Sequence, residues 1–364
     1  MNCTLFYSQA ANCRYRGYSS GPSLNEVVIV SAARTPIGSF RGCLSALPAT
    51  KLGSIAIKAA IERAGISPEE VKEVYMGNVL QAGEGQAPTR QAVLGAGLPM
   101  STPATTVNKV CASGMKSIML AAQSLMCGHQ GNCAENTAKK LNISREDQDT
   151  YAISSYTRSK ASWDSKLMAK EVVAVSIPQR GKPDLVVSED EEFKRVDFSK
   201  VPKVKAVFQK ENGTVTAANA STLNDGAAAL VLMTAEAAKR LNVTPMARIV
   251  GFADAAVEPI DFPIAPAFSA PKLLKATGIK KEDIAMWEIN EAFSVVVLAN
   301  IKMLDIDPQK VNINGGAVSL GHPIGMSGAR IVGHLTYNLK PGEYGMAGIC
   351  NGGGGASSII IQRL

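Results

Sequence analysis

The sequence predicts an α/β protein built from two similar halves. Short runs of β-branched and apolar residues alternate with segments of helical period, which is typical of a mostly parallel sheet covered by helices. Two segments also repeat in the same order at a nearly common offset. Residues 64–71 (AGISPEEV) resemble residues 277–284 (TGIKKEDI), and residues 113–116 (SGMK) resemble residues 327–330 (SGAR). Two ordered repeats indicate a duplication, and 364 residues are enough for two cores.

The first half alternates strands with helices. Val, Ile and Thr gather in three predicted strands, at residues 26–33, 71–80 and 105–110. Apolar residues recur at helical spacing in three predicted helices, at residues 50–63, 89–94 and 116–126. Gly65 is expected to end the first of these helices, because glycine readily adopts the left-handed conformation found at helix ends.

The middle of the chain is more polar than either half. Residues 132–141 and 148–163 predict polar helices, whereas residues 182–207 are charged, contain two prolines and predict an irregular loop region. Residues 214–233 are rich in small residues and are expected to end in a buried strand. The polar part is therefore interpreted as an insertion rather than as core.

The composition favours a globular protein with an anionic small-molecule ligand. Hydrophobic residues make up 46% of the chain and charged residues 19%, and no apolar run approaches the length of a membrane span. The net charge of +7 suits a phosphorylated ligand, and nucleic acid is not expected because no run is dense in Lys or Arg. Seven cysteines without a C-x-x-C pair indicate a reducing compartment.

The first residues resemble a mitochondrial transit peptide. The first acidic residue is Glu26, and the segment before it contains Arg14, Arg16 and several Ser and Tyr residues. A cleavable leader is expected over residues 1–23, and an untargeted leader is the alternative interpretation.

Cys111 follows a predicted strand and stands at the start of an apolar helix. The free N–H groups and the positive dipole end of such a helix favour a thiolate. Residues 112–114 are small enough to let a substrate reach the sulfur. A buried structural cysteine at a tight turn would give the same local pattern, so more distant residues must decide.

One of the three histidines stands in a loop suited to catalysis. His322 has small neighbours and is followed by Pro323, so an exposed and rigidly aimed imidazole is expected. His334 lies at helical spacing in an apolar segment and is expected to be structural. His129 follows a helix end and is expected to be a solvated cap.

Two further strand ends carry polar residues. Cys350 and Asn351 precede four glycines, whose N–H groups can approach a ligand closely, although a flexible turn is the alternative. Asn290 and Glu291 follow an apolar strand, where an amide can satisfy the backbone or orient a water or an oxyanion. Two cysteines suggest two tasks, in which one thiolate forms a thioester and the other moves a proton.

Together these segments resemble the thiolase family over nearly the whole chain. The matching motifs are VCASG at 110–114, NEAF at 290–293, GHP at 321–323 and CNGGG at 350–354. The resemblance implies a five-layer αβαβα fold of two duplicated halves with an inserted loop domain, and tetramers. It also implies the reversible Claisen condensation of two acetyl-CoA molecules to acetoacetyl-CoA and CoA. The segment around Phe262 suggests that thiolysis extends to 2-methylacetoacetyl-CoA.

The same resemblance implies a role for each candidate residue. Cys111 is expected to be the nucleophile that takes the acyl group. His322 activates it and, with a water held by Asn290, binds the thioester oxygen. Cys350 removes the α-proton of the second acetyl-CoA. The backbone N–H groups of Cys111 and Gly352 form the second oxyanion site.

Binding residues are implied in the same way, and no redox cofactor is implied. The coenzyme A nucleotide would lie against Tyr156, Arg195, Val196, Asp197 and Lys200, and the pantetheine would pass Ser221. A potassium ion would be held by Tyr156, Ala217, Ala218, Ala220 and Val318.

The implied organisation places an N-terminal half at residues 24–130 and 210–245 and a C-terminal half at 246–364. Residues 131–209 are what is left of the loop domain, and the leader would direct the chain to the mitochondrial matrix. A homo-oligomer is expected, although the oligomerisation loop of the family is missing here.

The chain departs from the family after Gln130. Family members carry a strand resembling V-x-A-G-G-x-E-x-M-S soon after the nucleophile helix, and then a long part of the loop domain. Here residues 128–130 run directly into residues 131–133. Because a helix that follows a parallel strand must return to a strand in the same sheet, this omission should expose a sheet edge.

Three hypotheses follow from the resemblance and the omission. The chain is an active acyltransferase, or it is a catalytically impaired variant that acts only as a non-enzymatic subunit. The third hypothesis is another thioester enzyme on the same fold, such as a ketosynthase or a hydroxymethylglutaryl-CoA synthase. The CNGGG motif at 350–354 argues against the third.

Overall fold

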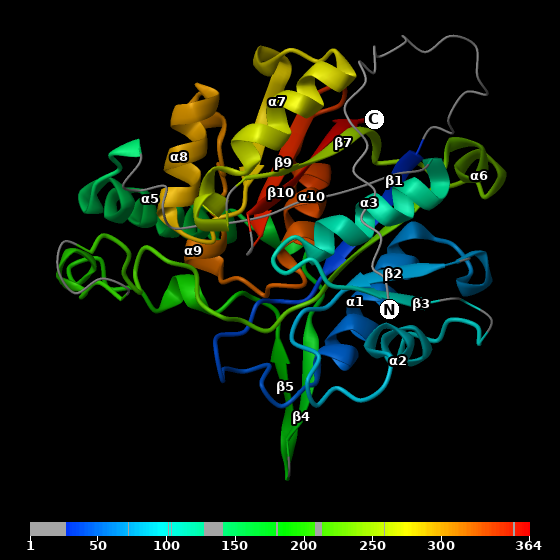
Figure 1. Cartoon of the computed structure of the whole chain (residues 1–364). Coiled ribbons are helices and arrows are strands. Elements are labelled where there is room, and N and C mark those ends of the chain that lie inside the picture. The colour runs from blue at the N-terminus through cyan, green and yellow to red at the C-terminus, as the bar shows by residue number, and fades with distance from the viewer. Residues whose placement is uncertain are drawn as a thin grey trace, which may run out of the picture.

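The computed structural model of the chain describes most of its length (Figure 1). The described residues are 27–71, 73–100, 102, 104–126, 141–179, 181–207, 213–257, 259–351 and 354–364. Several predictions concern residues outside these ranges. They are the predictions for the leader, for His129, for Gly352 and for the helix at 132–141 apart from its last residue.

The first half alternates strands and helices as predicted. Its elements are β1 (Val27–Arg34), α1 (Ala49–Ala64), β2 (Val74–Gly77), α2 (Pro88–Gly95), β3 (Ala104–Val107) and α3 (Ser113–Met126). Gly65 ends α1 in the left-handed conformation, with φ of 65°. β2 is shorter than expected because Pro68–Glu70 forms a 3₁₀ turn before it.

The middle of the chain is more regular than predicted. The helix expected at 148–163 is present as α5 (Arg145–Asp164), which begins with a capping box between Ser144 and Asp147. The expectation of an irregular region from residue 182 is wrong at its start. β4 (Val175–Gln179) and β5 (Lys182–Val187) form an antiparallel hairpin, because alternate residues of β4 can turn inward onto Leu44 and Leu52.

The second half repeats the pattern of the first. Its elements are β6 (Ala228–Thr234), α6 (Ala235–Arg240), β7 (Ala247–Ala256), α7 (Pro266–Thr277), β8 (Ile284–Ile289), α8 (Ser294–Leu304), α9 (Ala317–Leu320), α10 (Ser327–Asn338), β9 (Tyr344–Asn351) and β10 (Gly355–Arg363). β6 follows the middle region in sequence but pairs with β1 of the first half.

The main sheet is mostly antiparallel, so the expectation of a mostly parallel sheet is wrong. Six strands lie in the order β6-β1-β7-β10-β9-β8, and only β8 and β9 run parallel. The reason is that the last strand of each half returns beside the first strand in the opposite direction. In the first half β6 lies beside β1, and in the second half β10 lies beside β7. β2 and β3 form a separate parallel pair.

The packing of the helices confirms five layers. α3 and α10 lie together in the middle of the molecule (Figure 1), where their apolar side chains pack against β1, β7, β9 and β10. α1 and α2 cover the outer side of the first half, and α7 and α8 cover the outer side of the second. The order is therefore α, β, α, β, α.

The two middle helices approach closely because each begins with a Ser-Gly pair. A Cβ atom on Gly328 would lie 2.3 Å from the backbone nitrogen of Met115, and one on Gly114 would lie 2.7 Å from the oxygen of Gly325. The repeat seen in the sequence is therefore a packing requirement, because no larger residue fits at either glycine.

A buried ion network joins the middle region to the core. The guanidinium of Arg34 on β1 donates to Glu171 at 2.8 Å and to Asp190 at 2.7 Å. His334 of α10 contacts the other oxygen of Glu171 at 2.8 Å. Burial would raise the pKa of Glu171, but His334 and Arg34 lower it from 4.5 to about 2. The structural role expected for His334 agrees with these contacts.

We expect Glu171 to make the fold acid-sensitive. Because its folded pKa lies below its unfolded pKa, the stabilisation is complete above about pH 4.5 and is lost as the pH falls toward 2. Glu171→Gln should lower the free energy of unfolding at pH 7 by about 3 kcal/mol or more, since the Arg34 charge loses a partner. It should also flatten the fall in stability between pH 5 and 3, as measured by urea unfolding. If the free energy of unfolding falls equally steeply with pH in the unaltered chain and in Glu171→Gln, this expectation is wrong.

Candidate active site

Cys111 lies in a strained turn between β3 and α3. Val110, just before it, has φ of 46°, a conformation that a β-branched residue rarely adopts. Ser113 holds this turn, because its hydroxyl donates to the Val110 carbonyl at 2.6 Å and accepts from the Lys109 N–H at 2.8 Å. The half-buried thiol of Cys111 is thereby presented at the start of α3, as the sequence predicted.

Two buried lysines fasten this turn to the second half. Lys109 donates to Asp254 and to Ser357, both at 2.7 Å, and Lys116 donates to the other oxygen of Asp254 at 2.9 Å. Burial lowers the pKa of both lysines, with Asp254 opposing the shift. Burial would raise the pKa of Asp254, but Lys109 holds it below its usual value. A single carboxylate on β7 therefore positions the nucleophile turn.

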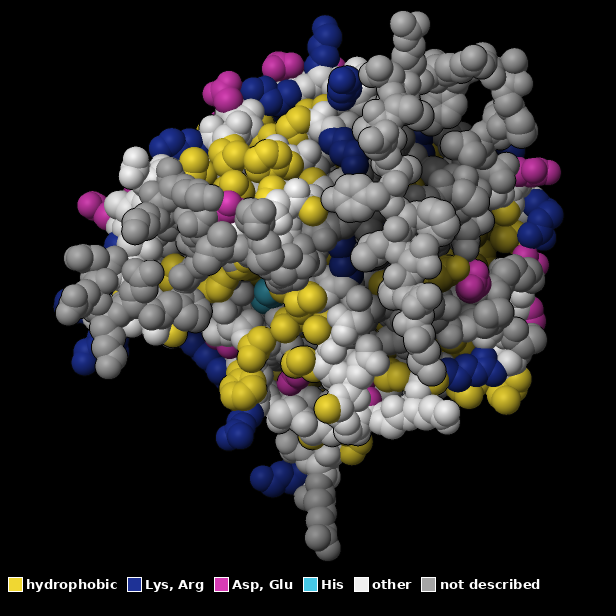
Figure 2. Space-filling model, viewed as in Figure 1, with side chains coloured by type: hydrophobic (Ala, Val, Ile, Leu, Met, Phe, Trp, Pro, Cys, Tyr) yellow, Lys and Arg dark blue, Asp and Glu magenta, His cyan; other side chains and the backbone are white. Residues whose placement is uncertain are grey.

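His322 is the histidine of the site, and it is buried rather than exposed as predicted. Its backbone N–H donates to Thr222 and to the Asn224 side chain. The ring is only 5% exposed, and of the two described histidines only this one has any exposed surface. Figure 2 accordingly shows one histidine at the bottom of a hollow flanked by hydrophobic side chains.

The contacts of His322 select one protonation state. Ser327 donates its hydroxyl proton to the Pro323 carbonyl at 3.1 Å, so it accepts from Nδ1–H of His322 at 2.6 Å. This tautomer leaves the Nε2 lone pair available. Burial and the charge of Arg330 lower the pKa of His322 from 6.5 to about 4. The imidazole is therefore neutral at pH 7 and able to take a proton at Nε2.

Asn290 lies next to this imidazole, and its backbone is joined to the strand that carries Cys350. The Asn290 amide nitrogen is 3.5 Å from Nε2 of His322, and its side-chain oxygen is buried with no partner among the described residues. Its backbone N–H donates to Gly348 at 2.9 Å, two residues before Cys350. Cys350 is fully buried at the end of β9.

The nucleophile turn reaches the same place from the other side. Ser357, which binds Lys109, pairs across the sheet with Ile349, the neighbour of Cys350. The N-terminus of α3 also touches the 322–327 loop, since Gly114 packs against Gly325. These contacts link the Cys111 turn, the loop that carries His322, Asn290 and the strand that ends beside Cys350.

Several supporting residues were missed by sequence reasoning. Ser327 and Lys116 were noticed only as members of a repeat, and Lys109 and Asp254 carried no local signal. Glu291 was treated as equivalent to Asn290, but it is a buried anchor. It accepts hydrogen bonds from four neutral donors on three segments, namely Tyr151, Ser155, Asn312 and the N–H of Val318.

The predicted binding residues fall into two groups. Tyr156, Val196 and Val318 share one buried cluster, in which burial raises the pKa of Tyr156 to about 12. The other three residues lie on the surface and form ion pairs. Arg195 pairs with Glu191, and Lys200 pairs with Asp197.

The turn at 216–221 connects these groups to the site. Ser221 donates its hydroxyl to Ala292 at 2.9 Å, and Ala220 bridges to Phe293. Ala217 and Ala218 precede them in the same turn. The next residues, 222–224, hold the backbone of His322. The 216–221 turn therefore lies beside the catalytic histidine.

The described residues contain no group of three His, Cys, Asp or Glu side chains that could hold a metal ion. None of the helices described is long and apolar enough to span a membrane.

Comparison with known sequences defines the class of the protein. The thiolase N-terminal domain matches residues 27–133 and 129–236, and the thiolase C-terminal domain matches residues 243–363. The chain belongs to the thiolase family.

Named relatives narrow this class. The chain is 71% identical to "Acetyl-CoA acetyltransferase, mitochondrial" of Danio rerio, with 99% of each chain covered. It is 70% identical to the Homo sapiens protein of that name, over 96% of this chain and 93% of that one.

Solved structures agree with the fold. The Acat5 thiolase of Ascaris suum in complex with coenzyme A has a TM-score of 0.88 at 42% identity, over 93% of this chain and all of that one. Human mitochondrial 3-ketoacyl-CoA thiolase also has a TM-score of 0.88, at 34% identity, over 94% of this chain and all of that one.

The comparisons also locate a gap. The two N-terminal matches meet at residues 129–133, and the Danio rerio alignment spans 414 positions, at least 50 more than this chain of 364 residues possesses. The relatives therefore carry a segment near Gln130 that this chain lacks.

We expect His322 to titrate far below an ordinary histidine. Its C–H proton resonances should shift with a midpoint near pH 4, because burial and Arg330 disfavour the imidazolium. The measurement is an NMR titration, with the resonance identified by its loss in His322→Gln. A midpoint near 6.5 would show that burial and Arg330 do not lower the pKa of this ring.

Proposed function

We propose that the chain is an acetyl-CoA C-acetyltransferase that joins two acetyl-CoA molecules to acetoacetyl-CoA and CoA and catalyses the reverse thiolysis. The observation that carries the proposal is the neutral His322, whose Nδ1–H is bound by Ser327 so that Nε2 is left to accept a proton. The 71% identity to a relative named for this activity supports it. Coenzyme A thioesters are its substrates, and it works in the mitochondrion, with the matrix as the proposed compartment.

The first step transfers an acetyl group to the enzyme. His322 takes the thiol proton of Cys111 at Nε2, and the thiolate attacks the carbonyl carbon of acetyl-CoA. The carbonyl oxygen becomes an oxyanion, which the Nε2–H of His322 and a water held by Asn290 stabilise. When the tetrahedral intermediate collapses, the C–S bond to coenzyme A breaks and His322 returns the proton to the leaving thiolate.

The second step forms the carbon–carbon bond. The Cys350 thiolate removes the α-proton of a second acetyl-CoA, and the resulting carbanion attacks the acyl carbon on Cys111. The bond to the Cys111 sulfur then breaks and acetoacetyl-CoA is released. The proton held by Cys350 passes to the Cys111 sulfur, which restores the starting state. The N–H groups of Cys111 and Gly352 are the proposed donors to the second oxyanion.

The remaining contacts would position coenzyme A. The surface residues Arg195, Asp197 and Lys200 are proposed to meet the nucleotide, with Tyr156 and Val196 behind them. Ser221 is proposed to meet the pantetheine, which its place beside the His322 backbone supports. Thiolysis is proposed to extend to 2-methylacetoacetyl-CoA, on the resemblance of the segment around Phe262 alone. A homo-oligomer is proposed as the working assembly.

A potassium ion is proposed near Tyr156, Ala217, Ala218, Ala220 and Val318. Glu291 supports this site, because its buried carboxylate accepts only from neutral donors, one of which is the Val318 N–H. Oxygen ligands are the donors that alkali cations prefer. When bound, the ion would neutralise this charge and hold the 216–221 turn.

We expect Cys111 and Cys350 to separate the two steps. Cys111→Ala should abolish both acyl-enzyme formation and turnover. Cys350→Ala should keep acyl transfer, seen as exchange of labelled CoA into acetyl-CoA, but lower thiolysis of acetoacetyl-CoA on the order of 10³-fold.

Cys43→Ser provides the matched control for these variants. Cys43 is a half-buried thiol whose pKa is raised to about 11 by burial and by Glu191. Replacing it with serine should leave both steps intact. Turnover that survives Cys111→Ala would exclude the mechanism, whereas absence of turnover in the unaltered chain would favour the non-enzymatic subunit.

We expect potassium to stabilise the chain more than sodium at equal ionic strength. The melting temperature should be higher and the KM for acetoacetyl-CoA several-fold lower in potassium chloride. Glu291→Gln should remove this difference, and Glu171→Gln should retain it because Glu171 is already paired with Arg34 and His334. Identical melting curves in the two salts would exclude the site.

A further inference from the structure

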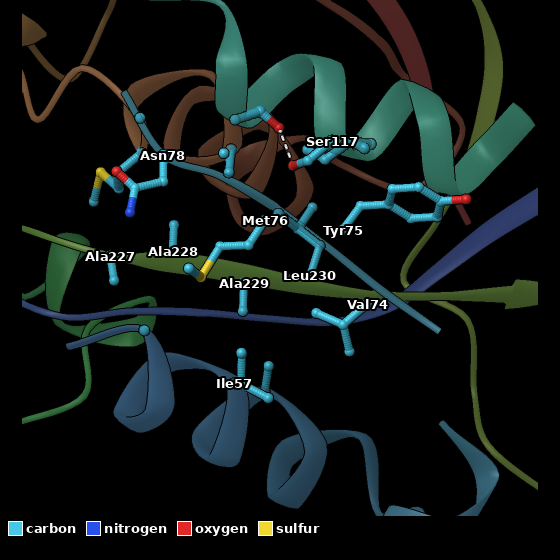
Figure 3. Close-up of a pocket in the computed structure, with 18 of the residues that line it drawn as sticks. Ile57, Val74, Tyr75, Met76, Asn78, Ser117, Ala227, Ala228, Ala229 and Leu230 are labelled. Atoms are coloured by element: carbon cyan, nitrogen blue, oxygen red, sulfur yellow. Dashed lines mark hydrogen bonds between the residues drawn. The ribbon is translucent and has the colours of Figure 1, made fainter. Parts of the chain in front are cut away.

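Two sheet edges face one cavity in the first half. β6 is the edge strand of the main sheet, and β2 belongs to the separate β2–β3 pair. A cavity of about 770 Å³ is lined by both strands and by α1 and α3; we call it the β2–β6 cavity. Figure 3 shows Met76 of β2 and Ala228 and Ala229 of β6 around this space, with Ile57 of α1 on one side and Ser117 of α3 on the other. The prediction that β6 is buried is wrong for this reason, because six of its seven residues are only half-buried.

The second half shows what would fill the same space. There β9 lies between β8 and β10, parallel to β8 and antiparallel to β10. The counterpart of β8 in the first half is β2, since the repeated segments 64–71 and 277–284 lead into these two strands. The counterpart of β10 is β6, since β6 pairs antiparallel with β1 as β10 does with β7. Among the described residues no strand lies between β2 and β6. The cavity therefore occupies the place of the counterpart of β9.

The open edge of β6 is able to pair with a strand. Ala227 exchanges hydrogen bonds with Thr35 on the β1 side. The backbone N–H and C=O groups of successive residues in a strand point to opposite sides. Those of Ala228, Leu230 and Leu232 therefore point away from β1, toward the cavity. An edge with this geometry is a template for another chain.

The walls of the cavity are suited to a largely apolar strand. Apolar side chains line it from both helices and both strands, among them Ile57, Ile61, Met76, Ile118, Leu230 and Val231. β6 has seven residues, so a full partner would be about 23 Å long at roughly 3.3 Å per residue. A few charged residues, among them Glu70, Glu84 and Arg240, also line it.

The break in the family match lies at the end of α3. α3 ends at Met126, and the two N-terminal matches meet at residues 129–133. In the second half, five residues separate the end of α10 at Asn338 from the start of β9 at Tyr344. A strand in the β2–β6 cavity would therefore begin in the segment that the relatives carry and this chain lacks.

We propose that the β2–β6 cavity binds a β-strand donated by a separate polypeptide, parallel to β2 and antiparallel to β6. The donated segment is the one missing after α3, supplied in trans. The chain's own residues 132–140 (NCAENTAKK) fit poorly by composition, because they contain a single β-branched residue and no aromatic residue, the types that favour a strand. The proposal does not depend on the catalytic roles.

A bound strand would also support the site. A Cβ atom on Gly77, at the end of β2, would lie 2.5 Å from the nitrogen of Gly114 and 2.6 Å from the oxygen of Gly325. β2 is thus in direct contact with both the nucleophile helix and the loop that carries His322. Fixing β2 in a continuous sheet would restrain both.

The test uses the full chain and synthetic ten-residue peptides. Overlapping peptides cover the positions of the Danio rerio relative that have no counterpart in this chain. The peptide that begins about five residues after the end of the α3 helix should bind and raise the melting temperature. It should slow amide exchange at Ala228, Leu230 and Leu232 about tenfold or more. The other peptides, and a scrambled copy, should do neither.

Two variants of the chain make the binding mode specific. Leu230→Pro removes an N–H that points to the cavity rather than to β1, so β6 can still pair with β1 but binding should weaken about tenfold or more. Leu230→Ala keeps that N–H and should bind nearly as well, and both variants should show a cooperative melt without peptide. Loss of binding in Leu230→Ala alone, with Leu230→Pro unaffected, would contradict strand pairing.

Other occupants give distinct results. If no peptide binds, or if peptides bind regardless of their position, the proposal is wrong. Slow exchange of the three β6 amides in the chain alone, at all concentrations, would mean that its own residues fill the cavity. Slow exchange that appears only at high chain concentration would mean that a second copy does. Either result would overturn the proposal.

Discussion

The arrangement of the site depends on the pair of buried lysines that share the carboxylate of Asp254. Lys109 and Lys116 stand on either side of Cys111 in the first half, and Asp254 belongs to β7 in the second. Charges buried in this way are costly unless they are paired, so the two halves are held in the relative position that brings the three side chains together. The nucleophile is thereby placed by a contact between halves, and the strain at Val110 is maintained by it.

The duplication is physical as well as sequential. Each half contributes one middle helix that begins with Ser-Gly, and each glycine allows the other helix to approach. Lys116 and Arg330 occupy the same position in the two helices, and both are buried opposite a carboxylate, Asp254 and Glu288. The halves differ in their sheets, because β9 completes the second while the β2–β6 cavity interrupts the first.

Much of the site could be predicted from sequence because its residues stand at the ends of predicted strands. Cys111, Asn290 and Cys350 follow apolar runs, and the small residues beside them mark turns. The expectation for His322 was right about its loop and wrong about its exposure, because the loop is covered by residues 222–224 from a distant part of the chain. Lys109 and Asp254 could not be found, since a buried ion pair leaves no local pattern.

The sequence alone determined the order of helices and strands, the repeated Ser-Gly helix starts and the choice of candidate reactive side chains. These depend on hydrophobic period, on glycine and on residue chemistry, which are all local properties. The tertiary structure decided the direction of the strands, the neutral tautomer of His322 and the open edge of β6. Each of these depends on which distant segments become neighbours: β10 beside β7, Ser327 beside the imidazole, and no described strand beside β6.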